Sequence, residues 1–364
     1  MNTLSEILSS HIFDIRPADA GAMRLACERQ ARLAKPLGSL GTLEALSVQM
    51  AGITGDVYNS VEKKHLVVFA ADHGVVAEGV ASTPQSVTLA QTVNLTRGKT
   101  GAAVLAGHFG CGVTVCDVGV NAVIQDTNVL NRKVAFGTRN FTNEPAMTRE
   151  QAETAILHGI TLAREICKNA DVIGVGEMGI GNTTAASAVL SVFSGLDAEE
   201  VTGRGAGLSD AAFENKKRVI RRAIAVNKPN AEDAVDVLCK VGGFDIAAMC
   251  GAFLGAAAER TPVVIDGFPS AVAALAAYRL CGSARDFFIP SHASREKGYA
   301  VAMDMLGLEP MLLLNMRLGE GSGCMLAFEI LSAACAVMRD MATFDGAGID
   351  SGYIDELMKN GDVF

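Results

Sequence analysis

A single glutamate stands between glycines near the C-terminal end of the chain, in the segment Arg317-Leu-Gly-Glu-Gly-Ser-Gly323. The segment follows an apolar run that we predict to be a strand, so Glu320 comes just after a strand ends. A charge in such a position is costly unless it has a task. A carboxylate in a dry pocket can act as a general base, whereas a glutamate at the start of a helix can simply be stabilised by the helix dipole. We predict that Glu320 is a general base, with helix capping as the alternative.

The densest glycine cluster, Gly174-Val-Gly-Glu-Met-Gly-Ile-Gly-Asn-Thr-Thr184, follows a predicted strand and precedes a predicted helix. Glycines let backbone N–H groups approach an anion, and the three polar residues that end the cluster can donate to phosphate oxygens. The cluster therefore predicts a phosphate cradle, with a glycine-rich turn and ordinary capping as the alternative. Residues 174–179 also match the GxGxxG dinucleotide pattern, but Glu177 would lie inside that loop and repel a pyrophosphate.

A second glycine cluster, Gly203-Arg-Gly-Ala-Gly207, precedes three consecutive cations on a predicted helix, Lys216, Lys217 and Arg218. Cations near a glycine-rich loop suit a phosphate monoester inside an otherwise acidic protein. We expect Lys217 and Arg218 to lie on a solvated helix face.

The sequence offers no set of residues with the spacing of a metal site. Val263-Val-Ile-Asp-Gly-Phe268 superficially resembles the loop of phosphoribosyl diphosphate transferases, but it lacks their paired acids and their downstream Thr-Gly-x-Thr run. The nine cysteines are scattered, with no CxxC pair and no cysteine and histidine at zinc-ligand spacing. We therefore predict no metal and no other cofactor, and we expect the cysteines to be reduced and mostly buried.

Apolar, β-branched runs recur through the chain and predict strands that are buried on both faces. Helical patterns lie between them, which indicates an α/β fold with a mostly parallel sheet flanked by helices. The predicted strands cover residues 65–70, 113–116, 171–175, 262–265, 287–289 and 311–314. The predicted helices between them cover residues 150–168, 184–193, 211–226, 247–259 and 270–280.

Polar side chains stand at the ends of the predicted strands. Because ligands bind at the carboxyl ends of the strands in open α/β sheets, we expect several acids and hydroxyls to converge on one crevice. Each of them alone could instead cap the following helix. The two histidines are expected to orient loops rather than to transfer protons. The residues are Asp72-His73, Asp117, Glu177, Asp266, Ser291-His292 and Glu320.

Helical patterns also occur near both ends of the chain, over residues 19–33 and 326–341. The segment Lys35-Pro-Leu-Gly-Ser-Leu-Gly41 interrupts the first of them, since proline and glycine end helices. We predict a small helical domain formed by residues 1–60 plus 335–364, and a large α/β catalytic domain formed by residues 61–334.

Composition narrows the class of protein and its partners. The chain has 364 residues, 49% of them hydrophobic, and a formal net charge of -9, as expected of a folded, enzyme-sized protein. The acidic balance and the absence of a long Lys/Arg run argue against nucleic acid or an anionic membrane as a partner. No apolar window reaches the length of a membrane span, about 18 residues, and the early acids do not fit a signal peptide. We expect a cytoplasmic protein.

Seven segments occur in the form and order of one known family, and together they span nearly the whole chain. They resemble the nicotinate-nucleotide:dimethylbenzimidazole phosphoribosyltransferases, which activate the lower ligand of cobalamin. The segments are Lys35-Pro-Leu-Gly-Ser-Leu-Gly41, Ala71-Asp-His-Gly-Val75, Gly176-Glu-Met-Gly-Ile-Gly-Asn-Thr-Thr184, Val241-Gly-Gly-Phe-Asp245, Ile265-Asp-Gly-Phe268, Pro290-Ser-His292 and Arg317-Leu-Gly-Glu-Gly-Ser-Gly323.

The resemblance implies a homodimer, a large domain with a parallel sheet, a small helical domain built from both termini, and specific site residues. It assigns the general base to Glu320 and a second catalytic glutamate to Glu177. The implied acceptor pocket consists of Thr83, Pro84, Gln91, Met178 and Leu318. The implied nucleotide and phosphate site consists of Gly179, Gly181, Asn182, Thr183, Gly203, Lys216, Asp266 and Ser294.

The implied reaction moves phosphoribosyl from nicotinate mononucleotide to a small aromatic acceptor. The glycosidic nitrogen of the mononucleotide belongs to a pyridinium, so nicotinate leaves as a neutral ring without a general acid. The acceptor attacks the opposite face of an oxocarbenium-like centre and inverts β to α, while Glu320 removes the acceptor's proton. Glu177 is expected to hold the ribose or to stabilise the developing positive charge, and correct placement is expected to supply much of the rate.

Several alternatives remain open from the sequence. The acceptor could be the oxygen of phenol or p-cresol rather than a benzimidazole nitrogen, and the chain could then be one subunit of a heterodimer with a homologue. The segment Ala81-Ser-Thr-Pro-Gln85 and Met178 depart from the serine and leucine of well-known benzimidazole-using members. We place the benzimidazole type first. More distant alternatives are an NAD-dependent dehydrogenase, based on the GxGxxG match, and a non-catalytic binding subunit, against which the presence of Glu320 argues.

Overall fold

The computed structural model describes residues 3–350 and 352. The chain divides into two compact units. A large unit groups Met1–Arg16 with Lys63–Ala327, and a small unit groups Pro17–Glu62 with Phe328–Phe364.

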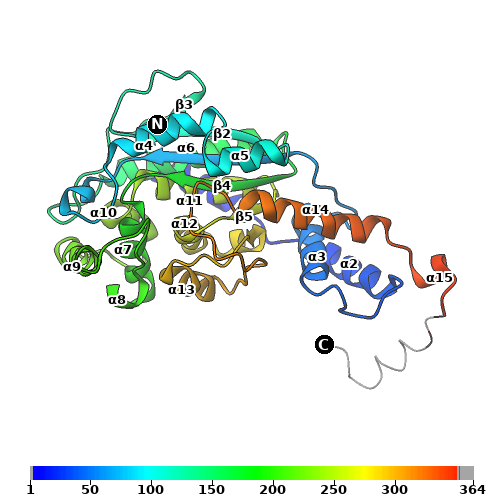
Figure 1. The fold of residues 1–364 in the computed structure, drawn as a ribbon. Helices are drawn as coiled ribbons and strands as arrows, with labels where there is room; N and C mark the ends of the chain where they lie inside the picture. Colours follow the sequence, from blue (N-terminus) through cyan, green and yellow to red (C-terminus); the bar gives the residue numbers. More distant parts are fainter. Residues whose placement is uncertain (1–2, 351, 353–364) are drawn as a thin grey trace. The chain divides into compact units, whose positions relative to one another are not determined.

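A six-stranded sheet forms the centre of the large unit (Figure 1). Its order is β3-β2-β1-β4-β5-β6, and every neighbouring pair is parallel, which confirms the predicted fold class. The order of the strands reverses between β1 and β4, and doubly wound sheets bind ligands at the carboxyl ends of the strands beside such a switch point. The strands are β1 Lys64–Ala71, β2 Gly112–Gly119, β3 Val129–Asn131, β4 Val172–Met178, β5 Val263–Ile265 and β6 Phe288–Pro290.

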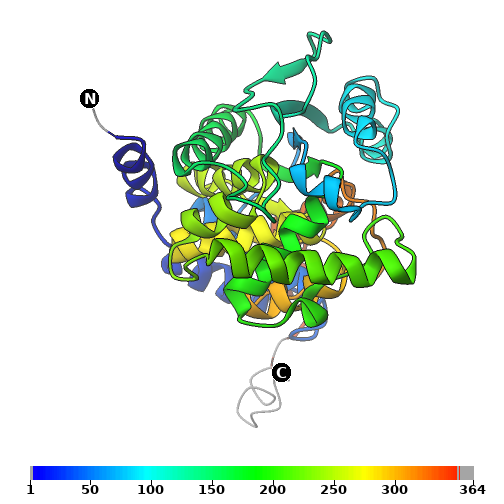
Figure 2. The same cartoon turned by 90° about the vertical axis from the view of Figure 1, so that its left-hand side faces the viewer.

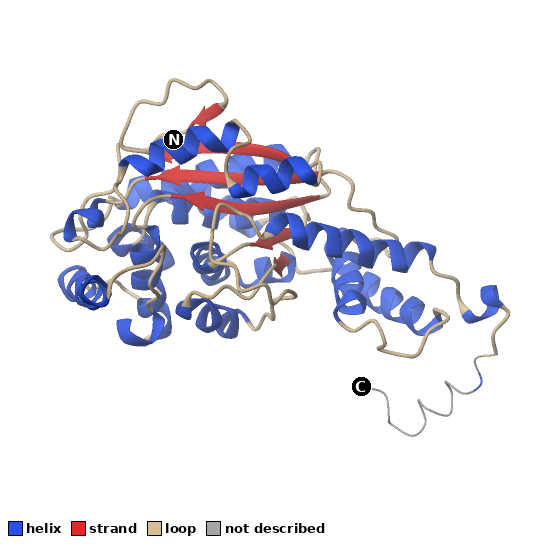
Figure 3. Cartoon of the chain, viewed as in Figure 1, coloured by secondary structure: helices blue, strands red, loops and turns tan. Residues whose placement is uncertain are grey.

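Helices of the large unit cover both faces of the sheet (Figure 3). In Figure 1, α4 (Ser86–Thr96) and α5 (Gly101–His108) lie in front of the sheet, whereas α6 (Arg149–Cys167) and α11 (Phe244–Ala258) lie behind it. The helices predicted between the strands are all present, with ends shifted by a few residues. The other elements of this unit are α1 Leu4–Phe13, α7 Asn182–Ser194, α8 Ala198–Val201, α9 Asp210–Asn227, α10 Ala234–Val241, α12 Phe268–Leu280, α13 Lys297–Leu306 and the 3-10 helices η1 Gly74–Glu78 and η2 Gly282–Phe287.

The small unit is helical within the described residues. It contains α2 (Ala20–Arg32), α3 (Thr42–Thr54), α15 (Phe344–Ala347) and the part of α14 (Cys324–Asp340) that begins at Phe328. Its core consists of Ala22, Ala26, Ala51 and Met338, whose small or unbranched side chains let the helices pack closely. The side chain of Arg29 on α2 also donates from Nε to the carbonyl oxygen of Met338 over 2.7 Å.

The unit boundaries differ from the predicted domains, 1–60 plus 335–364 and 61–334. Helix α1 belongs to the large unit, because Ser5 Oγ donates to Glu153 Oε1 on α6 over 2.6 Å and Leu8 is buried (Figure 2). The other boundary falls inside α14, so residues 328–334 belong to the small unit. The predicted boundary between residues 334 and 335 also falls inside this helix, and the turn at which the units divide depends on tertiary contacts that the sequence pattern does not show. Residues 1–2, 351 and 353–364 of the predicted small domain lie outside the described residues.

The apolar run at residues 311–314 is not a strand, which corrects the prediction. It makes only an isolated parallel bridge between His292 and Leu312, and the side chain of Leu313 is 82% exposed. The sheet ends at β6, so this run is not paired in the sheet and its side chains are not all buried. As a result, Glu320 lies in a loop rather than directly after a strand.

Helices α6 and α11 pack through glycines. A side-chain carbon at Gly159 of α6 would overlap the carbonyl oxygen of Ala248, and one at Gly251 of α11 would overlap the carbonyl oxygen of Ile156. The two backbones therefore approach more closely than any residue with a side chain would allow. This contact supports the face of the sheet behind β1 and β4.

We expect Gly251→Ala to lower the free energy of unfolding by about 1–3 kcal/mol, because the added methyl group meets backbone rather than a flexible side chain. Gly107→Ala is the matched control, since Gly107 lies in α5 with open space at its Cβ position and should gain about 0.5 kcal/mol or more from helix propensity. Urea unfolding of both variants measures the difference. Equal stability of Gly251→Ala and the wild type would contradict the close contact.

Candidate active site

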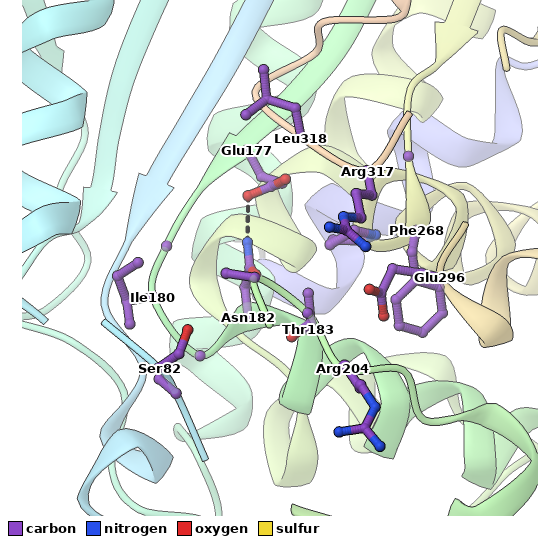
Figure 4. A pocket seen from close by; sticks show the side chains of 18 of the residues that line it. Ser82, Glu177, Ile180, Asn182, Thr183, Arg204, Phe268, Glu296, Arg317 and Leu318 are labelled. Carbon is purple, nitrogen blue, oxygen red and sulfur yellow. Dashed lines mark hydrogen bonds between the residues drawn. The ribbon is translucent and has the colours of Figure 1, made fainter. Parts of the chain in front are cut away.

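A cavity lies where the loops after β1, β4 and β5 meet (Figure 4). Its empty volume is about 880 Å³, part of which is open to solvent. The walls come from segments that are far apart in the sequence, chiefly residues 80–83, 177–183, 204–206, 267–269 and 317–319. The cavity occupies the switch point of the sheet, as the strand ends predict.

The glycine-rich segment forms a shorter turn than predicted. Gly174 and Gly176 lie inside β4, and the strand continues to Met178. Only Gly179 to Gly181 form the turn, and α7 begins directly afterwards at Asn182. Most of the residues that match GxGxxG therefore lie in strand β4. A dinucleotide-binding enzyme needs a phosphate-binding loop at this position, so the structure argues against the dehydrogenase alternative.

One end of the cavity is cationic and built for an anion. Lys216 is 1% exposed, and its Nζ donates to Thr183 Oγ1 over 2.9 Å and to the carbonyl oxygen of Gly203 over 3.2 Å. Burial lowers the pKa of Lys216 to about 8, and the charge of Glu296 opposes that shift. The N-terminus of α7 faces the same cavity, where the helix dipole favours negative charge.

Lys217 does not lie on a solvated face, contrary to the prediction. It is buried, and its Nζ contacts Glu199 over 2.8 Å and Glu214 over 2.6 Å. The neighbouring Arg218 is exposed, as predicted. Glu214 lies three residues earlier on the same helix, whereas Glu199 comes from α8, and this second contact is one that helix periodicity does not reveal.

Glu177 lies at the acidic end of the cavity. The side-chain amide of Asn182 donates to its Oε2, and a side-chain carbon at Gly319 would overlap its carboxylate. Burial, together with the charges of Asp245 and Asp266, raises the pKa of Glu177 to about 8. Glu177 is therefore mostly protonated at neutral pH, and a cationic ligand beside it would favour release of that proton.

A buried histidine–aspartate pair lies under this end of the cavity. His73 Nε2 is 3.1 Å from Asp245 Oδ1, and both side chains are fully buried. Burial disfavours the charged imidazole, but the charge and hydrogen bond of Asp245 outweigh it and raise the pKa of His73. His73 packs against the backbone at Gly179 and Gly243, in keeping with its predicted role of orienting loops.

Glu320 does not line the cavity. It is 6% exposed and adopts a left-handed conformation (φ 61°) between two left-handed glycines, Gly319 and Gly321. Its Oε2 accepts a hydrogen bond of 3.1 Å from the backbone N–H of Ala102, in the first turn of α5. This hydrogen bond holds one carboxylate oxygen of Glu320 in place beside α5.

Asp266 does not line the cavity either, which differs from its predicted place in the nucleotide site. Its Oδ2 accepts from the backbone N–H of Gly321 over 3.0 Å, and its Oδ1 accepts from that of Gly323 over 2.7 Å. Burial raises the pKa of Asp266 to about 7, although these backbone hydrogen bonds oppose the rise. In this arrangement Asp266 anchors the loop that carries Glu320.

The structure brings most of the other predicted residues to the cavity. The predicted residues that line it are Glu177, Thr83, Met178, Leu318, Gly179, Gly181, Asn182, Thr183, Lys216 and Ser294. Those that do not line it are Glu320, Asp266, Gly203, Pro84 and Gln91. Gly203 still takes part through its carbonyl oxygen, whereas Gln91 on α4 accepts a hydrogen bond from Asn94.

Sequence reasoning gave no site role to several residues that line the cavity, among them Arg204, Phe268, Glu296 and Arg317. Arg204 and Arg317 lie inside segments already singled out for their glycines, so their charge was an available signal. Glu296 stands in a short loop before α13, where nothing in its neighbours indicates a place in a cavity.

The described residues contain no cluster of three or more His, Cys, Asp and Glu side chains placed to hold a metal ion. In the same part of the chain, no helix has the length and apolar character needed to cross a membrane. None of the nine cysteines, all of which lie in the described part of the chain, forms a disulfide, and Cys116, Cys239, Cys250, Cys324 and Cys335 are buried.

Comparison with known proteins identifies the family. A family model described as Phosphoribosyltransferase matches residues 15–349. The chain belongs to this family. A relative from Ruminiclostridium cellulolyticum, named nicotinate-nucleotide–dimethylbenzimidazole phosphoribosyltransferase, is 49% identical over 96% of this chain and 98% of its own length. A relative of the same name from Clostridium tetani is 45% identical over 99% of this chain and its own full length.

Solved structures agree with this assignment. The crystal structure of a nicotinate-nucleotide–dimethylbenzimidazole phosphoribosyltransferase from Thermus thermophilus matches with a TM-score of 0.87 and 39% identity. The match covers 92% of this chain and 100% of the other. The family resemblance drawn from the seven sequence segments is thus confirmed.

We expect Glu177→Gln to reduce the dependence of this phosphoribosyltransferase's stability on pH. Burial raises the pKa of Glu177 from 4.5 to about 8, so between these values the folded protein binds more protons than the unfolded chain and stability falls as pH rises. Glutamine removes this contribution to the free energy of unfolding, which is on the order of a few kcal/mol across that pH range. The pH-dependent contribution of Asp266 remains. Urea unfolding at a series of pH values measures the effect.

The exposed Glu309→Gln is the control and should keep the wild-type pH dependence. If Glu177→Gln loses stability toward alkaline pH as steeply as the wild type, Glu177 is not a buried acid with a raised pKa.

Proposed function

We propose that this phosphoribosyltransferase transfers phosphoribosyl from nicotinate mononucleotide to dimethylbenzimidazole or a related aromatic base. The products are the α-ribotide and nicotinate, and the reaction belongs to cobalamin and cobamide biosynthesis. Support comes from the names of relatives that match this chain over nearly its whole length. The observation that carries the proposal is one cavity with the buried cation Lys216 at one end and the buried carboxyl group of Glu177 at the other.

The cationic end suits the phosphate of the mononucleotide. Lys216 contacts Thr183 in the first turn of α7, and the dipole of this helix favours the negative charge of a phosphate. Arg204 and Arg317 line the same cavity and supply further positive charge. Ser294 and the backbone at Gly203 complete our proposed phosphate site.

The acidic end suits the pyridinium of the same molecule. The bond between the anomeric carbon and the pyridinium nitrogen breaks, and its electron pair goes to that nitrogen, so nicotinate leaves as a neutral ring. An acceptor nitrogen forms the new bond from the opposite face. Glu177, in its deprotonated form, stabilises the positive charge that develops on the ribose.

We propose that Glu320 takes the proton that the acceptor nitrogen loses. The N–H of Ala102 holds its carboxylate beside Leu318, which lines the cavity, so a small movement of this side chain would bring Glu320 to the acceptor. Thr83, Met178 and Leu318 are the proposed walls of the acceptor slot, since they line the same cavity as Glu177. No observation favours phenol or p-cresol over a benzimidazole, so a benzimidazole remains the acceptor that we propose.

The oligomeric state of the protein is a further prediction. A homodimer, or a heterodimer with a homologous subunit, stays a prediction that rests on the family resemblance.

Incubation of the protein with nicotinate mononucleotide and, separately, with dimethylbenzimidazole, adenine and phenol tests the function. We expect nicotinate release and an α-ribotide mass with dimethylbenzimidazole, unaffected by a chelator. Glu320→Gln should lower kcat by about 10²–10⁴-fold, because it removes the base, while binding of the mononucleotide changes little. Glu309→Gln, an exposed change of the same kind, should leave kcat unchanged.

Turnover by Glu320→Gln at a near wild-type rate would remove this residue from the mechanism. Absence of ribotide with all three acceptors would contradict the proposed function, and a strict magnesium requirement would contradict metal-independent transfer.

A further inference from the structure

Glu296 is a carboxylate inside the cationic end of the cavity. It lies in the loop between β6 and α13 and lines the cavity. Its Oε2 is buried and accepts no hydrogen bond from any residue that the structure describes. A buried charged oxygen without a hydrogen bond is costly, so its position requires an explanation.

The position of Glu296 coincides with the place that suits a phosphate. A side-chain carbon at Gly203 would overlap the Glu296 carboxylate, and the carbonyl oxygen of the same Gly203 accepts from Lys216 Nζ. The charge of Glu296 is also felt by Lys216, whose pKa it raises against the effect of burial. Figure 4 shows the Glu296 carboxylate directed into the cavity, between the ends of Arg317 and Arg204 in this view.

Little holds the side chain of Glu296 in this position. Glu296 is the N-cap residue of α13, yet its side chain makes no capping hydrogen bond. The hydrogen bonds at this residue belong to its backbone, whose N–H donates to Ser294 Oγ over 3.4 Å and whose carbonyl oxygen accepts from Tyr299 over 3.0 Å. The side chain can therefore turn about its own torsions without breaking a helix cap.

A phosphate and this carboxylate cannot share Lys216. Two anions within a few ångströms repel each other strongly in a partly desolvated site. Lysine has three donors, and Lys216 uses two of them on Thr183 and Gly203, so a third is available for either anion.

We propose that Glu296 occupies the phosphate site of the nucleotide-free protein as an internal substitute for phosphate, and that the phosphate of the incoming nucleotide displaces it. The identity of that nucleotide rests on the proposed function, whereas the competition for the site rests on the cavity alone. In the free protein the carboxylate offsets the buried charge of Lys216. A ligand without a phosphate gains nothing from displacing Glu296, so the residue favours a mononucleotide over the corresponding riboside.

A different role for Glu296 predicts the opposite sign. Carboxylates in nucleotide sites often accept hydrogen bonds from ribose hydroxyls. In that case, removing the charge would weaken binding of every ligand with a ribose, and it would leave inorganic phosphate unaffected.

Calorimetric titration of Glu296→Gln with inorganic phosphate, nicotinate mononucleotide and nicotinate riboside at neutral pH separates the two roles. We expect inorganic phosphate and the mononucleotide to bind about tenfold more tightly than to the wild type, because no carboxylate has to be displaced. Binding of the riboside should stay within about twofold. Asp304→Asn, which removes an exposed charge from α13, is the control for net charge and should bind all three ligands as the wild type does.

Unchanged or weaker binding of inorganic phosphate by Glu296→Gln would overturn the proposal, and weaker binding of both ribose-containing ligands would assign Glu296 to the ribose. Glu296→Ala should change phosphate binding in the same direction, and thermal unfolding of both variants verifies that they are folded. Because these readouts use no acceptor and no turnover, failure of the transfer reaction would be distinguishable from failure of this proposal.

Discussion

The site depends on the hydrogen bonds between the Asp266 carboxylate and the loop that carries Glu320. Asp266 stands directly after β5, and its two oxygens accept from the backbone N–H groups of Gly321 and Gly323. These bonds tie the loop to the sheet and satisfy backbone donors that would otherwise be buried without partners. They also hold Glu320 in a left-handed conformation, which a residue with a side chain adopts only where its surroundings impose it.

A separation of charge follows from this arrangement. Glu177 lines one end of the cavity, and Asp266 is buried outside it; burial and the charges of neighbouring acids raise the pKa of Glu177 to about 8 and that of Asp266 to about 7. Lys216 occupies the other end, and burial lowers its pKa to about 8. A substrate with an anionic phosphate and a cationic ring matches both ends, and its ring would draw Glu177 toward the charged form.

The sequence predicts the parallel sheet, the helices between its strands and most of the cavity wall. It does so because buried strands have distinctive apolar runs and because polar residues at their ends meet at one edge of the sheet. The glycine cluster predicts a place for Asn182 beside an anion, and Asn182 lines the cavity. The choice of Lys216 over Lys217 comes from the family resemblance, because a helix pattern alone does not distinguish the two.

Other features depend on tertiary contacts that no local pattern records. Asp266 stands at a strand end as a ligand-binding residue would, but its side chain turns to a neighbouring loop rather than to the cavity. The apolar run at residues 311–314 has the composition of a strand, yet the sheet has already ended at β6. Helix α1 joins the large unit through contacts with α6, as in the bond from Ser5 to Glu153, which are 148 residues apart in the sequence. Glu296 reaches the cavity from the loop between β6 and α13, which has no apolar pattern from which its position could be predicted.

The most direct test of this account is the kinetics of Asp266→Asn together with its affinity for nicotinate mononucleotide. Asparagine keeps the shape of aspartate but cannot accept both backbone N–H groups, so the loop should shift. We expect kcat to fall by about a hundredfold, as small misplacements of reacting groups do, while the dissociation constant of the mononucleotide changes by less than about threefold. An unchanged kcat, or a loss of affinity equal to the loss of kcat, would contradict the role of Asp266 as the residue that positions Glu320.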